Sequence, residues 1–261
     1  DAVLLAGDMA DDSRGDAGVD ALMSALGGAY PCCYVSGNHE VRTGCLDALK
    51  RRFRSWGITV LEGSGTLLAT PGGTLRICGV DDPSAFAGES GWLEQFRACQ
   101  ALTGDSRYTV LLSHRPERTE DYAGRGFELV LAGHAHGGQW RLPGLLNGLF
   151  APDQGLFPTY AGGRYALGDT TLLVSRGLAR ESTRLPRFYN RPELVMVELR
   201  PGLEEFPDKK KMRYKILFLT LGVLPWENRQ YALSFCPNPR FLLPGAKGCC
   251  QAGGFRLQSY R

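Results

Sequence analysis

The 261-residue chain lacks the features that would place it in several special classes of protein. No run approaches the roughly 18 apolar residues that a membrane-spanning helix requires. None of its eight cysteines forms a C-x-x-C pair, which argues against a zinc site built from thiolates. Cys32, Cys33 and Cys78 stand in apolar runs, where we expect buried, reduced thiols. Nothing in this use of cysteine demands an oxidising compartment.

Lysine is scarce in the first 202 residues: five of the six lysines follow Gly202. The segment up to Gly202 is mildly acidic, which argues against a nucleic-acid-binding surface there, and residues 203–261 are basic. We therefore predict one domain over residues 1–202 and a basic tail over residues 203–261, whose status is open.

The tail combines three lysines at 209–211 with a mostly apolar run over residues 216–226. This order is that of a signal peptide in the wrong place. An interfacial membrane segment, a short core helix and a misread frame are the other interpretations. Because the last strand-like pattern ends near Leu199, we expect no core strand in the tail and expect residues 1–202 to fold alone.

Short apolar runs alternate with helical patterns along the first 200 residues. We expect strands at residues 2–6, 32–36, 75–80, 108–113, 128–132, 171–175 and 194–199. Helical patterns lie between several of them, at residues 19–26, 45–56 and 91–101. This alternation predicts an α/β architecture in which helices cover a sheet.

Polar residues that could bind a metal follow five of the expected strands. They are Gly7-Asp8, Gly37-Asn38-His39-Glu40, Asp81-Asp82, His114-Arg115 and Gly133-His134-Ala135-His136. All four histidines of the chain belong to this pattern. Open α/β sheets build their sites at the carboxyl ends of strands, so we expect these side chains to lie at one edge. Each of these groups alone is common in ordinary turns. The four other than Asp81-Asp82, in this order and each after a strand, favour a metal site.

Carboxylate, amide and imidazole ligands together suit borderline divalent ions of the Mn, Fe, Zn or Ni type. Two such ions, bridged by one carboxylate and a hydroxide, polarise a phosphoryl group and supply a nucleophile at neutral pH. A further histidine beside them could protonate the departing alkoxide. The residue types therefore point to phosphate-ester hydrolysis.

The order of these motifs resembles that of the calcineurin-like metallophosphoesterase superfamily. The stretches LLSHRPE (111–117), LAGHAHGGQ (131–139), VSRGLA (174–179) and NRPELVMVEL (190–199) are similar to its bacterial branch of membrane-associated phosphodiesterases. That branch includes enzymes that hydrolyse UDP-2,3-diacylglucosamine in lipid A metabolism. Over residues 1–200 the resemblance implies a four-layer α/β/β/α sandwich with a dinuclear metal site.

The resemblance also implies roles for individual residues. Asp8 would bridge two divalent metal ions, Asn38, His114 and His134 would complete one site, and His136 would belong to the other. His39 would contact the phosphate and act as general acid or transition-state stabiliser. For Arg115 we weigh a phosphate contact against a surface arginine and favour the surface. For Asp81-Asp82 we weigh a role in orienting a ligand against a turn and favour the turn.

One departure from the family pattern concerns the second metal site. The family begins with an Asp-x-His motif on a first strand, and this chain has no Asp-x-His anywhere. It opens at Asp1 in a strand-like run, without an initiator Met. We therefore expect the chain to be truncated at its N-terminus, lacking its first strand and two ligands, with a weak second ion site.

Together these observations predict a metal-dependent phosphoesterase. We expect hydrolysis of a phosphodiester or pyrophosphate in a small, lipid-linked or nucleotide-containing substrate. The alternative is a catalytically impaired metal-binding fragment. The expected location is the cytoplasm or the periphery of a membrane, with peripheral membrane contact and no nucleic-acid partner.

Overall fold

The computed structural model describes residues 1–10, 17–70, 73–142, 144–179, 186–199, 214–219 and 255–260. One six-stranded sheet has the order β14-β12-β13-β1-β2-β3. Its strands are β1 (Ala2–Ala6), β2 (Cys32–Val35), β3 (Thr59–Val60), β12 (Leu194–Leu199), β13 (Tyr214–Leu219) and β14 (Phe255–Tyr260). The neighbours from β13 to β3 pair in parallel, whereas β12 is antiparallel to β13 and β14.

The second six-stranded sheet has the order β10-β11-β7-β6-β5-β4. Its strands are β4 (Ser64–Thr70), β5 (Gly73–Gly79), β6 (Thr109–Leu112), β7 (Leu129–Ala132), β10 (Gly163–Leu167) and β11 (Thr170–Val174). The four central strands pair in parallel, and β4 and β10 close the edges as antiparallel strands. A separate hairpin joins β8 (Phe150–Ala151) to β9 (Gly155–Leu156).

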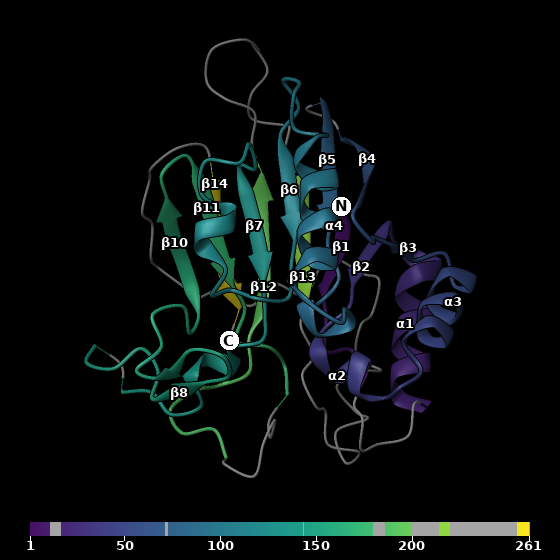
Figure 1. Ribbon diagram of the computed structural model, residues 1–261. Helices are drawn as coiled ribbons and strands as arrows, with labels where there is room; N and C mark the ends of the chain where they lie inside the picture. The colour runs from purple at the N-terminus through teal and green to yellow at the C-terminus, as the bar shows by residue number, and fades with distance from the viewer. Residues whose placement is uncertain are drawn as a thin grey trace.

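The helices cover the outer faces of the two sheets (Figure 1). They are α1 (Ala17–Ala29), α2 (Asn38–Arg42), α3 (Leu46–Ser55), α4 (Glu89–Gln100) and α5 (Thr119–Tyr122), with 3-10 turns η1 (Pro83–Ala85) and η2 (His136–Gly138). The three helical patterns expected from the sequence correspond to α1, α3 and α4. Among the described residues, no helix is both long and apolar enough to cross a membrane.

Strand alternation divides the interior into three cores. Leu4 and Ala6 of β1 face the second sheet, while Val3 and Leu5 pack in the core that α1 and α3 cover. On the second sheet the outer residues pack against α4, whose Trp92 is fully buried. Three cores between four layers confirm the expected α/β/β/α sandwich.

The seven strands expected in the first 200 residues are all present, within two residues of their expected bounds. Cys32, Cys33 and Cys78 are buried and form no disulfide, as expected. Burial raises the pKa of the Cys32 and Cys33 thiols to about 12, which keeps them protonated and unreactive at neutral pH.

The expectation that no core strand follows Gly202 is wrong. β13 lies between β1 and β12 in the middle of the first sheet, and its register pairs Ala2 with Ile216. Ile216 and Phe218 are fully buried in the core between the sheets. The apolar run after residue 215 therefore supplies an interior strand. The boundary at residue 202 stays a prediction, since most of the tail lies outside the described residues.

Candidate metal centre

The end of β1 is shaped so that Asp8 can face the opposite sheet. Gly7 and Asp8 both have left-handed backbone conformations, with φ of 82° and 57°. A Cβ added to Gly7 would lie 2.6 Å from His114 Nδ1, so this approach requires glycine. The buried Glu40 carboxylate fixes the turn by accepting hydrogen bonds from the backbone N–H groups of Asp8 and Ala10, each at 2.9 Å. It accepts two more, from Met9 and, at 2.8 Å, from Gly37.

Four residues expected as ligands converge on one point. His114 Nε2 lies 3.2 Å from Asp8 Oδ2, 3.1 Å from Asn38 Oδ1 and 3.2 Å from His134 Nδ1. Asp8 and Asn38 come from the first sheet, and His114 and His134 from the second. The site therefore spans the carboxyl ends of strands in both sheets, as the sequence predicts, although their role as ligands stays a prediction.

A second group shares Asp8 with the first. Ligand atoms of Asp8, His39 and His136 lie within 4.8 Å of one another. The backbone N–H of His39 also donates to Asp8 Oδ1 at 3.1 Å. The sequence predicts a catalytic role for His39, and the structure places its imidazole where it could also bind an ion.

The charges of the site follow from burial and from the central carboxylate. Burial opposes the ionisation of Asp8, but the histidines around it outweigh burial and hold its pKa well below its usual range. Burial likewise opposes the charged form of His114, yet Asp8 raises the pKa of this imidazole to about 9. Burial lowers the pKa of His134 to about 4 and that of His136 to about 3. Two neutral imidazoles therefore face one ionised carboxylate at neutral pH.

A further shell of contacts surrounds His134. Its Nε2 lies 2.7 Å from Asp153 Oδ2, in the β8–β9 turn, and 3.0 Å from Arg115 Nη1. Arg115 in turn donates two hydrogen bonds to Asp82, at 2.6 and 2.9 Å, and a third to Asp153. Because Arg115 is only 9% exposed, the preference for a surface arginine is wrong.

Asp81 and Asp82 do more than form a turn. Asp82 does cap η1, since its Oδ1 accepts from Ser84 N at 2.9 Å, but it also holds Arg115 against His134. Asp81 is buried and accepts hydrogen bonds from Ser36 at 2.6 Å and from Lys50 at 2.8 Å. The turn interpretation is therefore incomplete for both residues.

Glu40 and Asp153 are residues of this region to which the sequence assigned no individual role. Glu40 is visible in the sequence only as the residue after Asn38-His39. Asp153 lies 19 residues from its histidine partner, in a segment without a motif. Asp153 has a left-handed backbone conformation, with φ of 58°, which is uncommon for a residue other than glycine. This feature is visible only in the structure.

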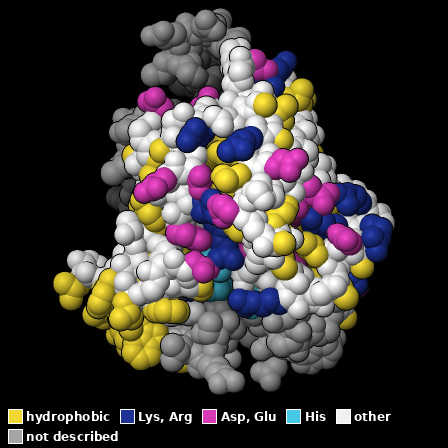
Figure 2. All heavy atoms as spheres, viewed as in Figure 1, with side chains coloured by type: hydrophobic (Ala, Val, Ile, Leu, Met, Phe, Trp, Pro, Cys, Tyr) yellow, Lys and Arg dark blue, Asp and Glu magenta, His cyan; other side chains and the backbone are white. Residues whose placement is uncertain are grey.

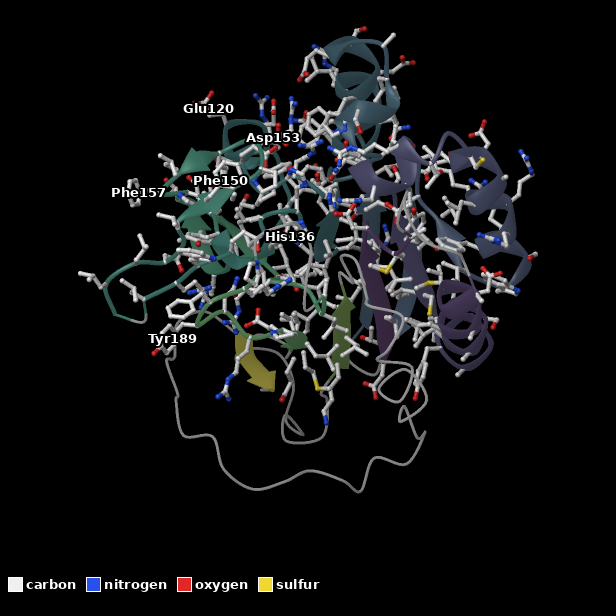
Figure 3. The ribbon with its side chains drawn as sticks, turned by 90° about the horizontal axis from the view of Figure 1, so that it is seen from below. Glu120, His136, Phe150, Asp153, Phe157 and Tyr189 are labelled. Atoms are coloured by element: carbon white, nitrogen blue, oxygen red, sulfur yellow. The ribbon has the colours of Figure 1, made fainter. Side chains whose placement is uncertain are left out.

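An apolar ridge lies beside the centre. We use this name for the exposed side chains of Trp140, Leu142, Leu145, Phe150, Leu156, Phe157, Phe188 and Tyr189, which are 41–84% exposed. Figure 2 shows hydrophobic side chains gathered at the lower left, next to a hollow in which histidine is visible. Figure 3 shows Phe150, Phe157 and Tyr189 on the side of the molecule to the left of His136.

Comparison with known proteins gives a consistent result. A family model described as calcineurin-like phosphoesterase matches residues 1–138, a range that contains all six predicted site residues. Phosphodiesterase YaeI of Escherichia coli (strain K12) is 31% identical over 203 residues, which cover 76% of this chain and 70% of that protein. The uncharacterized metallophosphoesterase YkuE of Bacillus subtilis (strain 168) is 29% identical over 208 residues, covering 77% and 68%.

Proposed function

Because the chain belongs to the calcineurin-like phosphoesterase family, we propose that it hydrolyses a phosphodiester or pyrophosphate bond with the help of two divalent metal ions. Asp8 would bridge the ions, Asn38, His114 and His134 would complete one site, and His136 would belong to the other. The ligand types favour Mn, Fe, Zn or Ni.

One observation carries the proposal. His114 Nδ1 lies 2.7 Å from the carbonyl oxygen of Ala6, so this nitrogen must donate. Without a cation, Asp8 raises the pKa of the ring to about 9 and Nε2 keeps a proton. In the neutral ring, which is the form that can bind a cation, the lone pair is on Nε2 because Nδ1 carries the proton. Nε2 then faces Asp8 Oδ2 and Asn38 Oδ1, which are acceptors as well. Asp8 Oδ2 is buried and accepts no hydrogen bond. Several acceptors that crowd one buried point fit a cation.

Bound divalent ions would polarise the phosphoryl group and lower the pKa of a water molecule enough to supply the nucleophile near neutral pH. The chain's own residues do the rest. Glu40 holds the backbone of the Asp8 turn through hydrogen bonds, and Asp153 orients His134 through Nε2. His39 would contact the phosphate and donate a proton to the departing alkoxide.

The apolar ridge supports a substrate that carries an apolar group. Exposed side chains such as Leu145 (84%) and Phe157 (66%) are costly to leave in water, and they lie beside the site. We therefore extend the proposal to a lipid-linked substrate, of the kind that acylated UDP-sugars represent in lipid A metabolism. Work at the periphery of a membrane, from the cytoplasm, would follow from such a substrate.

The direct test is hydrolysis of bis(p-nitrophenyl) phosphate by the Mn²⁺-loaded chain. We expect activity that an Asp8→Asn variant loses by at least about a hundredfold, because the shared carboxylate would hold both ions. Asp169→Asn, at an exposed position in the turn between β10 and β11, is the matched control and should keep full activity. Equal activity of the wild type and Asp8→Asn would refute the proposal.

A second candidate function is metal binding with impaired catalysis. The sequence has no Asp-x-His motif, and the second group holds three ligand atoms, from Asp8, His39 and His136. Measuring bound metal and turnover on the same sample separates the two functions. One tightly bound ion without turnover would favour the second candidate, and two ions with turnover would favour the first.

A further inference from the structure

The segment from Pro186 to Asn190 is fixed directly beside the candidate metal centre. Asn190 Nδ2 donates to the carbonyl oxygen of His136 at 2.7 Å and to that of Gln139 at 3.1 Å. Phe188 N donates to the Gln139 carbonyl at 3.2 Å, and Trp140 Nε1 donates to the Pro186 carbonyl at 2.9 Å. These bonds hold the backbone of residue 187 against the turn that carries His136.

Arg187 differs from its neighbours in this segment. Phe188 and Tyr189 are 52% and 66% exposed and belong to the apolar ridge. The three side-chain nitrogens of Arg187, in contrast, are all buried, and none of them makes a hydrogen bond. A guanidinium presents five N–H donors, so this side chain buries a full set of unused donors.

Two other arginines in the described part of the chain, Arg115 and Arg176, have side chains only 11% and 14% exposed, and both are paired with carboxylates. Arg115 donates twice to Asp82, and Arg176 donates to Glu193 at 2.8 Å and through a second, shorter contact. Glu193 is the acid whose charge acts on Arg187, but its Oε2 accepts both hydrogen bonds from Arg176. A purely structural role for Arg187 would call for such a partner, because an unpaired buried charge is destabilising.

The electrostatic surroundings of Arg187 point toward the metal centre. Asn190, three residues further on, donates to the backbone of His136, and the charge of Arg187 acts on the His136 imidazole, so Arg187 lies close to this predicted ligand. Burial, with Arg176 nearby, lowers the pKa of Arg187 itself to about 10. An anion bound to the guanidinium would supply the hydrogen-bond acceptors that it lacks.

We propose that Arg187 binds a non-bridging phosphate oxygen of the substrate beside the metal centre. The planar fork of the guanidinium matches two oxygens of a phosphate group. This inference rests on the proposed function, since it concerns the phosphate of the same substrate. It adds a phosphate contact from the segment after β11 to the one proposed for His39.

Inorganic phosphate is the probe that tests this proposal without turnover. Calorimetry on the Mn²⁺-loaded chain should give a dissociation constant that rises at least tenfold in Arg187→Met. Arg187→Lys keeps the charge without the fork and should lie between the two. Arg191→Met, at an exposed arginine directly after this segment, is the matched control and should bind phosphate as the wild type does.

Thermal unfolding supplies a readout that a structural role would not give. Without phosphate, Arg187→Met should unfold at a higher temperature than the wild type, because it removes an unpaired buried charge. Added phosphate should raise the unfolding temperature of the wild type clearly more than that of Arg187→Met. A lowered unfolding temperature with phosphate stabilisation intact would overturn the proposal, as would an equal loss of binding in Arg191→Met.

These outcomes also separate the inference from the proposed function. A chain that binds phosphate through Arg187 but hydrolyses no ester would disprove the function and keep the inference. A chain that hydrolyses diesters with unchanged phosphate binding in Arg187→Met and Arg187→Lys would do the reverse. Metal content should be equal in all these variants, since Arg187 offers no ligand atom to a cation.

Discussion

Asp153 contacts the imidazole of His134 but is not itself one of the predicted ligands Asp8, Asn38, His114 and His134. Asp153 Oδ2 lies 2.7 Å from Nε2, which leaves Nδ1 directed at His114. Carboxylates in this arrangement fix the tautomer of a metal-binding histidine and raise its basicity. We therefore assign Asp153 a positioning role.

Replacing Asp153 by Asn should weaken metal binding by about 10–100-fold, because the amide removes the charge that favours the required tautomer. Titration of Mn²⁺ by calorimetry measures the change. Asp169→Asn, at an exposed position, should leave the affinity unaltered. Unchanged affinity in Asp153→Asn would mean that His134 needs no orienting partner.

The role of His39 can be separated from metal binding by the choice of leaving group. His39→Ala should lower kcat for an alkyl phosphodiester by about 10²–10⁴-fold, since an alkoxide needs a proton as it departs. The loss should be smaller for an activated aryl diester, whose leaving group needs less protonation. An equal loss with both substrates, together with loss of one bound ion, would make His39 a ligand instead.

The meeting of the six motif residues at one edge could be predicted from the sequence, because each comes within four residues of the end of a strand. Asp8 and His134, for example, come within three residues of a strand end, and parallel strands bring such positions to one edge. Glu40, Asp153 and Arg187 were not predictable as functional. Glu40 and Asp153 act through partners elsewhere in the fold, and the role proposed for Arg187 rests on a buried side chain without a hydrogen bond; no local pattern in the sequence encodes either property.

Helix α3 is joined to the second sheet by a small group of charges. Lys50 Nζ lies 2.8 Å from Glu62 Oε1 and 2.8 Å from Asp81 Oδ2, and Arg54 also contacts Glu62. Burial of Glu62 opposes ionisation, but Lys50 and Arg54 outweigh it and lower the pKa of the carboxyl group. A lowered pKa stabilises the folded state above the unfolded pKa, and this contribution is lost as pH falls through the folded pKa.

Glu62→Gln should therefore reduce the free energy of unfolding at pH 7 by less than about 1 kcal/mol, because Glu62 is partly exposed and screened by solvent. The difference from the wild type should shrink as the pH falls below about 4. Urea unfolding at pH 7 and pH 3 measures both values. Glu94→Gln, on the exposed face of α4, should show no such pH dependence.

The buried position of β13 predicts that its side chains contribute strongly to the stability of the first sheet. Phe218 is fully buried between the sheets, whereas Leu217 on the opposite face is partly buried against the core that α1 and α3 cover. Phe218→Ala should cost about 3–5 kcal/mol of unfolding free energy, and Leu217→Ala about 1 kcal/mol. Equal small losses would show that β13 is dispensable to the sheet.

The strands that the sequence predicted are mostly buried, and those that it missed were missed for two different reasons. The seven expected strands are short apolar runs bounded by glycine or polar residues, and most are buried on both faces. β4 and β10 lie at sheet edges, with exposed residues such as Leu67, so their pattern is weak. β13 is apolar, but the basic residues that precede it in the sequence also fit a membrane-binding segment. Its pairing with β1 joins residues more than 200 positions apart, which no local pattern predicts.

The centre connects the two halves of the molecule. Asp8, Asn38 and His39 follow strands of the first sheet, and the remaining histidines follow strands of the second. An ion bound between them would cross-link the sheets in the folded state and have no equivalent in the unfolded chain.

Removing metal should consequently lower the unfolding temperature. At a metal concentration one hundred times the dissociation constant, binding contributes about 2.7 kcal/mol, or about 5–10 °C for a chain of this size. Scanning calorimetry before and after chelation measures the shift. We expect Mn²⁺ to restore it in the wild type and not in His114→Asn. A shift that His114→Asn retains would place the ion elsewhere.

The position of β13 has a consequence for the order of folding events. The first strand of the chain, β1, pairs with residues 216–219, so its sheet closes only when a segment from the far end arrives. Contacts of such long sequence separation slow folding. During synthesis, at about 5–20 residues per second, β1 would wait about 10–40 s for this neighbour. Until then its backbone N–H and C=O groups on that side are an open edge, on which a chaperone or a second nascent chain can act.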